Sequence, residues 1–318
     1  MNNFSSELRV GVVIPCYRVA RHLGAVIAEI PSFVREIIVV DDCCPEGSGH
    51  IAQRLGAQDS RISVVFHQEN QGVGGAVISG YRVALERGCD IIVKLDGDGQ
   101  MDPRDIAALI QPLVEGSADY AKGNRFRDFP ALKEMPAIRL FGNSVLSFWV
   151  KAVSGYWNIM DPTNGFTAIH RNTLTKLDLD RISRSFFFES DMLIHLNPLG
   201  AVVQDVPLQA RYGDEQSSLK IGRVILYFPF KLIKGFVRRI FLKYFIYDFN
   251  MASVYIMCGI PLFTFGVVFG GIHWLHSLIT GTPRSAGTIM LAALPIILGF
   301  QMLLQAVQID IDRTPKRR

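Results

Sequence analysis

Two aspartates in the first third of the chain, Asp96 and Asp98, have the spacing of a divalent-metal site. They are separated by one glycine and directly follow an apolar run, Ile91–Leu95, that is typical of a buried strand. Two carboxylates at the end of such a strand can face one small volume, and Gln100 adds a neutral oxygen. Oxygen ligands of this kind suit Mg²⁺ or Mn²⁺, which often share their coordination with phosphate oxygens. The alternative is a polar turn that caps the next helix, expected to begin near Asp102.

The elements that must position these carboxylates alternate along the first two hundred residues. Short apolar runs are followed by amphipathic helical patterns, which predicts a doubly wound α/β fold with a mostly parallel sheet covered on both faces. Ligands of such sheets bind beyond the carboxyl ends of the strands. The expected strands are 9–15, 36–41, 62–67, 91–95 and 166–170, and the expected helices are 20–29, 47–55 and 74–87.

Several candidate site residues lie at the expected carboxyl ends of these strands. Pro15, Asp41, Asp42 and Asn70 all occupy such positions, as does Asp96. One carboxylate of the Asp41-Asp42 pair could accept hydrogen bonds from a nucleotide base or ribose. The alternative is that this pair caps a helix.

A glycine-rich run, Asn70–Gly75, follows the third expected strand. A dinucleotide-binding G-x-G-x-x-G pattern would need glycine at position 77, which is Val77, so a dehydrogenase is disfavoured. The glycines instead allow a tight turn and close approach of a ligand to a helix N-terminus.

Charge divides the chain into two parts. The 318 residues carry a net charge of +4, yet seven Lys/Arg and no Asp/Glu lie between Gln216 and Tyr247, so the rest is net negative. The globular part therefore has no basic excess for binding nucleic acid. Five cysteines show no C-x-x-C spacing, and we expect reduced thiols facing the cytosol.

Two stretches near the C-terminus, 249–272 and 288–309, contain no charged residue. At about 1.5 Å per residue, each is long enough to cross a hydrocarbon core of about 30 Å. Gln301, Gln305 and Gln308 fall on one face of the second stretch. Because lipid disfavours a polar stripe, we predict that this face meets another helix, within the same protomer or in a second one.

The segment 222–247 interleaves cations with aromatic residues. Such a mixture can indicate single-stranded nucleic acid binding, but directly before a membrane span it indicates interfacial helices on anionic lipid. We predict that Pro229 and Gly235 break the segment into short helices. This segment and Lys316–Arg318 flank opposite ends of a two-span hairpin, so the positive-inside rule predicts that both are cytoplasmic. The first ten residues lack a signal-peptide pattern, so the N-terminus is also expected in the cytoplasm.

Four ordered motifs resemble those of family 2 GT-A glycosyltransferases: Ile14–Tyr17, Val39–Asp42, Asn70–Ala76 and Leu95–Gln100. Later segments resemble the polyprenyl-phosphate branch of that family, which includes dolichol-phosphate mannose synthase and bactoprenol glucosyltransferases. These segments are Gly123–Arg125, Asp161–Phe166, Arg211–Gly213 and Ser217–Lys220. Two segments depart from the usual pattern, Arg18–Ala20 and Cys43–Ser48, and both lie near the expected nucleotide base, whose recognition is therefore left open.

The resemblance implies roles for specific residues. Asp98 and Gln100 would bind the cation on the donor diphosphate, with Asp96 on the metal or the sugar nucleotide, and Asp161 would face the donor sugar. Glu189 would be a general base for a hydroxyl acceptor or a positioning group for a phosphate acceptor. The alternative for Glu189 and Asp191 is a favourable charge in the first turn of a helix. The residues implied in nucleotide-sugar binding are Pro15, Tyr17, Asp41, Asp42, Asn70, Gly72 and Asp96, and those implied in acceptor-phosphate binding are Arg125, Arg139, Arg211, Ser217 and Ser218.

The implied function is metal-dependent, inverting transfer of a hexose to polyprenyl (undecaprenyl) phosphate, with UDP-glucose as the favoured donor. A phosphomonoester is largely a dianion at neutral pH, so it needs arginines to orient it rather than a general base. Alternatives are GDP-mannose or UDP-GlcNAc as donor, a hydroxyl-acceptor polysaccharide transferase, or a non-catalytic sugar-nucleotide sensor or scaffold.

The expected organisation has three parts. These are a GT-A catalytic domain (1–220), interfacial helices (221–248) and a two-helix transmembrane region (249–318). Self-association is expected through the transmembrane or juxtamembrane helices.

Overall fold

A computed structural model describes residues 8–125, 137–208 and 221–317, without the side chains of 137–143 and 221–228. The chain divides into two compact units, which we call the sheet unit (1–239 and 315–318) and the hairpin unit (240–314).

The hairpin unit is an insertion in the sheet unit. The chain leaves the sheet unit after Arg239 and rejoins it at Pro315. Within the sheet unit, Arg317 then forms an ion pair with Asp119 at 2.8 Å. The functional division expected at residues 220 and 248 stays a prediction.

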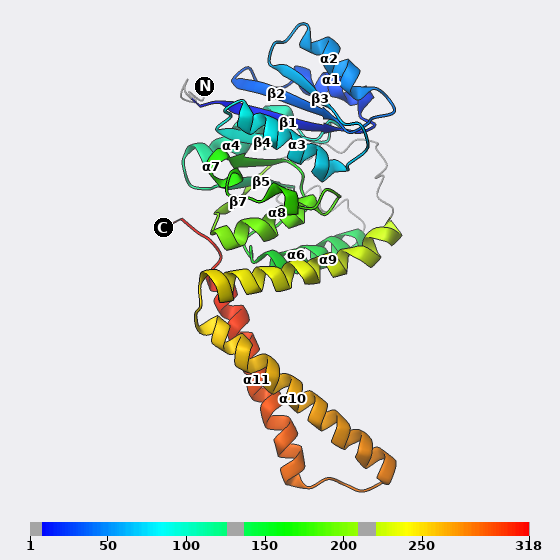
Figure 1. Ribbon diagram of the computed structural model, residues 1–318, viewed down its shortest axis with the longest axis vertical. Coiled ribbons are helices and arrows are strands. Elements are labelled where there is room, and N and C mark those ends of the chain that lie inside the picture. Colours follow the sequence, from blue (N-terminus) through cyan, green and yellow to red (C-terminus); the bar gives the residue numbers. More distant parts are fainter. Residues whose placement is uncertain (1–7, 126–136, 209–220, 318) are drawn as a thin grey trace. The chain divides into compact units, whose positions relative to one another are not determined.

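The sheet unit contains a seven-stranded sheet in the order β3-β2-β1-β4-β6-β5-β7 (Figure 1). β6 runs antiparallel to its neighbours β4 and β5, and the remaining pairs are parallel, so the predicted α/β fold is confirmed with a mixed sheet. All five expected strands are present, whereas β5 and β7 were not expected. The strands are β1 (Val10–Cys16), β2 (Val34–Asp41), β3 (Ile62–Phe66), β4 (Ile91–Lys94), β5 (Tyr120–Asn124), β6 (Thr167–His170) and β7 (Val203–Pro207).

Helices cover both faces of the sheet because successive strand residues point to opposite sides. Val13 and Ile38 pack into one core, whereas Val12 and Ile37 pack into the other. The first core is closed by α3 (Val73–Glu86), α6 (Ala137–Ser154) and α8 (Phe188–Leu196). The second is closed by α1 (Ala20–Ala28), α2 (Ser48–Gly56) and α4 (Ile106–Val114). Short helices connect these elements: η1 (Pro103–Asp105), α7 (Arg171–Leu174), η2 (Leu179–Arg181) and η3 (Asn197–Leu199).

One helix, α9 (Ile221–Phe241), continues through both Pro229 and Gly235, so the predicted break into short pieces is wrong. Leu232 is buried in the core that α8 also closes. A Cβ at Gly235 would lie 2.7 Å from Ile194 Cδ1 on α8, so this glycine permits close helix packing. These contacts offset the one backbone hydrogen bond that Pro229 cannot donate.

Several cations of this segment contact the protein, and the expected contact of the segment with anionic lipid stays a prediction. Arg239 is fully buried, and its guanidinium donates to the carbonyls of Val153 at 2.6 Å and Ala152 at 3.0 Å. These carbonyls belong to the last turn of α6, where helical acceptors lack intrahelical partners. Arg238 contacts His195, and Lys231 donates to two serine hydroxyls of the sheet unit.

The hairpin unit consists of η4 (Leu242–Tyr247), α10 (Met251–Thr280) and α11 (Ala286–Asp312). Helices α10 and α11 are long and apolar enough to cross a membrane. They include the predicted spans 249–272 and 288–309, except for residues 249 and 250. They pack closely at small residues: a Cβ on Gly299 would lie 2.5 Å from the Phe263 nitrogen.

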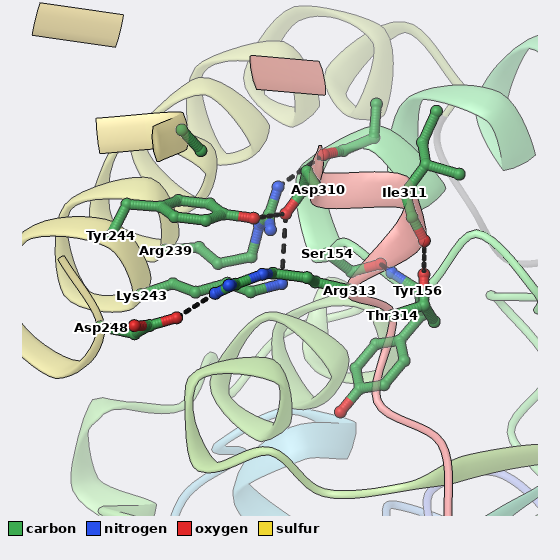
Figure 2. A network of polar contacts seen from close by, with 12 residues as sticks. Ser154, Tyr156, Arg239, Lys243, Tyr244, Asp248, Asp310, Ile311, Arg313 and Thr314 are labelled. Carbon is green, nitrogen blue, oxygen red and sulfur yellow. Dashed lines mark hydrogen bonds and ion pairs between the residues drawn. The ribbon is translucent and has the colours of Figure 1, made fainter. Parts of the chain in front are cut away.

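Figure 2 shows the polar cluster at the open end of the hairpin. The Tyr244 hydroxyl donates to Asp310 at 2.6 Å, and the Lys243 ammonium lies 3.2 Å from the same carboxylate oxygen. Arg313 forms an ion pair with Asp248. These contacts tie η4 to α11, and the ammonium of Lys243 is paired within the hairpin unit.

The glutamine stripe of α11 is exposed. Gln301, Gln305 and Gln308 all lie on the outer surface of the hairpin, and Gln308 donates to Asp312 at 3.1 Å. The stripe therefore does not face α10, and its contact with another helix stays a prediction.

Candidate active site

The predicted site residues that the structure describes converge on one edge of the sheet. Cys16, Asp41, Lys94 and Asn124 end four parallel strands at this edge. Because β6 is antiparallel, its first residue, Thr167, lies at the same edge between Lys94 and Lys122. Loops that follow or precede these residues carry the polar side chains.

The metal motif lies in the loop after β4. Asp96 Oδ1 accepts a hydrogen bond from Lys94 Nζ at 2.7 Å, and Asp98 Oδ1 accepts one from the Gln100 backbone N–H at 3.0 Å. Gly165, just before β6, approaches the motif so closely that a Cβ there would lie 2.5 Å from Asp96 Oδ2. The loop before β6 and the metal motif therefore form one packed structure.

This donor set fits a divalent cation that is shared with a diphosphate. Two carboxylates and an amide oxygen are hard ligands of the type that Mg²⁺ and Mn²⁺ prefer. Among the described residues, no group of three or more His, Cys, Asp or Glu could form a metal site made by the protein alone. A cation here would thus need further oxygen ligands, which phosphate groups supply. Asp96, Asp98 and Gln100 remain predicted ligands.

A buried lysine joins the metal motif to Glu189. Lys94 Nζ lies 2.7 Å from Asp96 and 3.1 Å from Glu189 Oε1, and the lysine side chain is 1% exposed. Burial lowers the pKa of Lys94, but the two carboxylates outweigh it and raise the pKa above its ordinary value. Lys94 is therefore a buried cation, and Glu189 has a specific partner beyond the dipole of α8.

A second ion pair lies on the β5 side of the site. Arg125 Nε lies 2.8 Å from Asp161 Oδ2, and a second guanidinium nitrogen donates to Oδ1 at 3.2 Å. Asp161 is fully buried, whereas the Arg125 side chain is 39% exposed. The pair is bidentate, so Asp161 fixes the orientation of Arg125. A direct contact of Asp161 with the donor sugar stays a prediction.

Lys122, which is fully buried, and Asp205, which is half-buried, lie close to this ion pair. Lys122 donates to the Asn164 carbonyl, and burial lowers its pKa to about 8 against the opposing pull of nearby carboxylates. Asp205 accepts from the Met160 N–H at 2.6 Å and from the Asn124 side chain at 3.1 Å. Burial raises the pKa of Asp205 to about 6.

Asp41 and Asp42, predicted to bind the nucleotide, hold loops together in the structure. Asp41 accepts backbone hydrogen bonds from Cys44 at 2.7 Å and Gly49 at 2.5 Å. Asp42 accepts from the N–H groups of Gln71 and Gly72, both at 2.8 Å. It also contacts His67 at 2.7 Å. Asp41 thus accepts from the first turn of α2, although the N-cap of that helix is Gly47, and contact with a nucleotide stays a prediction.

The other predicted nucleotide residues surround these loops. Pro15 is buried in β1, whereas Tyr17 is 44% exposed just beyond it. Asn70 is exposed, and its side chain donates to the Asp42 carbonyl at 3.1 Å. Gly72 has a φ of +82°, and a Cβ there would lie 2.6 Å from the Arg184 carbonyl oxygen, so both backbone and space require glycine.

Part of the predicted acceptor site lies outside the described residues. Arg211, Ser217 and Ser218 fall there, and so does the side chain of Arg139, although its backbone belongs to α6. Asp191 is described: it accepts from the Ser183 N–H at 2.7 Å and so holds the segment before α8.

The sequence interpretation missed Lys94, Lys122 and Asp205. A signal was present for Lys94, which ends the otherwise apolar run IIVK, whereas Lys122 and Asp205 lie in the more polar runs YAKGN and VQDVP. Charged residues are seldom fully buried unless they are paired, so such positions indicate internal ion pairs.

Comparison with known proteins agrees with this geometry. Residues 11–178 match the family described as "Glycosyl transferase family 2". An undecaprenyl-phosphate mannosyltransferase of Micrococcus luteus is 31% identical over 63% of this chain and 83% of its own. A UDP-N-acetylglucosamine–dolichyl-phosphate N-acetylglucosaminyltransferase of Methanococcus voltae is 29% identical over 68% of this chain and 92% of its own.

Solved structures show the same fold. Glucosyl-3-phosphoglycerate synthase of Mycobacterium tuberculosis, in complex with Mn²⁺, UDP-glucose and phosphoglyceric acid, aligns with a TM-score of 0.53. It is 18% identical, and the alignment covers 74% of this chain and 80% of that one. Mannosyl-3-phosphoglycerate synthase of Rubrobacter xylanophilus aligns with a TM-score of 0.53 at 18% identity over 76% and 77% of the two chains.

Proposed function

The chain belongs to glycosyltransferase family 2, in its polyprenyl-phosphate branch, and from that premise we propose that it transfers a hexose from a nucleotide sugar to polyprenyl phosphate. The observation that carries the proposal is the meeting of two features at one edge of the sheet. The first is the metal motif that contains Asp96, which suits a cation shared with a diphosphate. The second is the guanidinium of Arg125, which the buried carboxylate of Asp161 orients.

On the donor side, Asp96, Asp98 and Gln100 would hold Mg²⁺ or Mn²⁺ on the diphosphate. The cation would neutralise the negative charge that develops on the leaving nucleoside diphosphate. The loops that Asp41 and Asp42 hold in place would line the nucleotide-binding site. UDP-glucose is the donor that we favour, from the resemblance to bactoprenol glucosyltransferases. GDP-mannose and UDP-GlcNAc stand beside it as candidates, because relatives are named for mannose and N-acetylglucosamine transfer.

On the acceptor side, Arg125 would orient the lipid phosphate, helped by Arg139, Arg211, Ser217 and Ser218. A phosphate dianion is already a nucleophile, so the site needs cations to align it with the anomeric carbon. A single in-line displacement inverts that carbon. The geometry supports this assignment because Asp161 presents Arg125 as a planar, oriented donor.

A hydroxyl acceptor would instead need a general base, for which Glu189 is the candidate. Glu189 is bound to the buried ammonium of Lys94 in the structure. A positioning role for Glu189 therefore fits this geometry better, and a phosphate acceptor is the proposal.

The setting we propose is the cytoplasmic face of a membrane. The two apolar helices of the hairpin unit would span the bilayer, with the sheet unit on the side of the positively charged flanks. There a soluble nucleotide sugar can meet the head group of a membrane lipid.

The test is transfer of label from a panel of nucleotide sugars into lipid. Purified full-length protein would be incubated with undecaprenyl phosphate, Mg²⁺ or Mn²⁺, and labelled UDP-glucose, GDP-mannose or UDP-GlcNAc in turn. We expect lipid-linked label from one donor and its loss, by a factor of about 100 or more, in Asp98→Ala. A matched control is Asp59→Ala, because Asp59 lies at the opposite edge of the sheet, just before β3.

Two results would contradict the proposal. If folded protein transfers sugar from none of the donors to undecaprenyl phosphate whose identity has been verified, the proposed acceptor class is wrong. If Asp98→Ala remains fully active, the metal motif is wrong.

A further inference from the structure

We propose that Lys94 is a positioning residue for the donor half of the site, because its ammonium fixes Asp96 and Glu189 before any ligand binds. Lys94 is the last residue of β4, and its Nζ lies within 3.1 Å of both carboxylates. The inference rests on the proposed function, since it requires a divalent cation and a diphosphate at Asp96 and Asp98. It adds a residue outside the D-x-D-x-Q motif to the donor site.

The ammonium has no room to move. A Cβ on Gly165 would lie 2.5 Å from Lys94 Nζ and also 2.5 Å from Asp96 Oδ2, so the loop before β6 closes over the pair. Thr167 lies beside Lys94 in the strand register. The lysine side chain is fully enclosed, so the cation cannot swing to solvent and back.

This enclosure has a consequence for Asp96. One of its oxygens is bound to Lys94, so the carboxylate presents a fixed direction to an incoming cation. A carboxylate that is already oriented loses less conformational freedom on metal binding than one on an untethered loop.

Lys94 also balances charge. Asp96, Asp98, Glu189 and a diphosphate would together place several negative charges in one small volume. A buried ammonium between two of the carboxylates reduces this repulsion. Removal of Lys94 should therefore weaken binding of the diphosphate through this repulsion, and binding of the cation through the loss of the Asp96 tether.

The experiment measures Mn²⁺ binding by electron paramagnetic resonance on the full-length chain in detergent, with UDP and with GDP present in turn. In Lys94→Met, which keeps the length of the side chain but not its charge, we expect the dissociation constant of Mn²⁺ to rise at least about tenfold. In the transfer assay, the KM of the donor should rise while the KM of the lipid phosphate stays within about twofold.

A matched control is Lys122→Met, which removes the other buried lysine beside Thr167. Lys122 binds the Asn164 carbonyl rather than a metal-motif carboxylate, so Mn²⁺ affinity should change by less than about threefold. The single variant Lys94→Met leaves both Asp96 and Glu189 without their ammonium partner. A second variant, Lys94→Met with Glu189→Gln, also removes the negative charge of Glu189. If the double variant is folded, it should still bind Mn²⁺ weakly, since Asp96 has lost its tether.

The outcomes separate the two proposals. If native protein fails to bind Mn²⁺ both in the presence of UDP and in the presence of GDP, the donor site itself is wrong and the proposed function is overturned with it. If native protein binds Mn²⁺ and either folded variant at position 94 binds equally well, the positioning role alone is overturned.

Discussion

At the scale of single residues, the site depends on charges that are buried in pairs or networks. Asp205 is the clearest example, because its carboxylate is held by one backbone and one side-chain donor yet remains costly to ionise. Burial raises its pKa from 3.8 to about 6. In the unfolded chain the same carboxylate ionises near its ordinary pKa, so the folded state binds the proton more tightly between about pH 4 and pH 6.

This difference predicts a pH dependence of stability. The contribution of Asp205 is fully present below about pH 4 and is lost as the pH rises through about 6, a change of roughly 2 to 3 kcal/mol. In Asp205→Asn this loss disappears, because asparagine can still accept from the Met160 N–H without ionising. Thermal unfolding at several pH values should therefore show the variant gaining stability relative to native protein as the pH rises from 4 to 7.

The matched control for that series is Asp180→Asn, because Asp180 is largely exposed. Its thermal unfolding would be measured over the same pH range, so that the effect of removing a carboxylate outside the site is known. A flat difference for Asp205→Asn would contradict the assignment of a buried, proton-binding carboxylate.

Residue spacing predicted the metal motif but not the residues that hold it. Asp96 and Asp98 could be recognised because they lie two positions apart after an apolar strand. Lys94 belongs to the strand itself, and its partner Glu189 comes from α8, so only the fold brings them together. Likewise, the resemblance implied roles for Arg125 and Asp161 separately, and the structure shows that they form one ion pair.

At the scale of elements, α9 shows how packing overrides local signals. Proline and glycine predicted breaks, yet Leu232, Gly235 and Arg239 recur at helical spacing and form one buried face. Strands β5 and β7 escaped prediction for the opposite reason, because each is short and carries polar residues that find partners only in the folded site.

The opposite face of α9 predicts how the sheet unit meets a membrane. Phe230, Ile233 and Val237 lie on one side of the helix and are more than half exposed. Arg238 and Arg239 contact the protein, whereas Lys234 is exposed beside these side chains. The surface offered to lipid is therefore mainly apolar, and docking should depend little on salt.

To measure this docking, Ile233→Trp would be reconstituted into vesicles that contain brominated lipid. Fluorescence quenching beyond that of the native chain is expected, with little change from about 50 mM to about 0.5 M NaCl. Vesicles without bromine serve as the control. Quenching that vanishes at high salt would show that charge, not apolar contact, holds α9 to the bilayer.

At the scale of the whole molecule, the exposed glutamine stripe of α11 predicts self-association. Gln301, Gln305 and Gln308 do not face α10, and amides gain little in lipid unless they find partners on another chain. Hydrogen bonds between helices in lipid contribute about 0.6 kcal/mol each, so three are worth roughly a twentyfold change in the dissociation constant.

Replacing all three glutamines by leucine should therefore lower the oligomer fraction, as measured by cross-linking in native membranes. The matched control replaces three exposed apolar residues of the same helix: Ile297→Leu, Leu304→Ile and Val307→Leu. Equal cross-linking in both variants would rule out the stripe as an interface.

The insertion of the hairpin unit imposes a rule of parity. A segment that leaves a folded unit and returns to it must cross a bilayer an even number of times, since the host unit cannot occupy both sides at once. The ion pair of Arg317 with Asp119 binds the returning chain to the sheet unit, so both ends of the hairpin unit are attached to the same folded unit. Deleting α11 alone would make the number of crossings odd and carry Arg317 to the far side, away from Asp119. Deleting both helices restores an even number, so the sheet unit should tolerate the loss of two spans better than the loss of one.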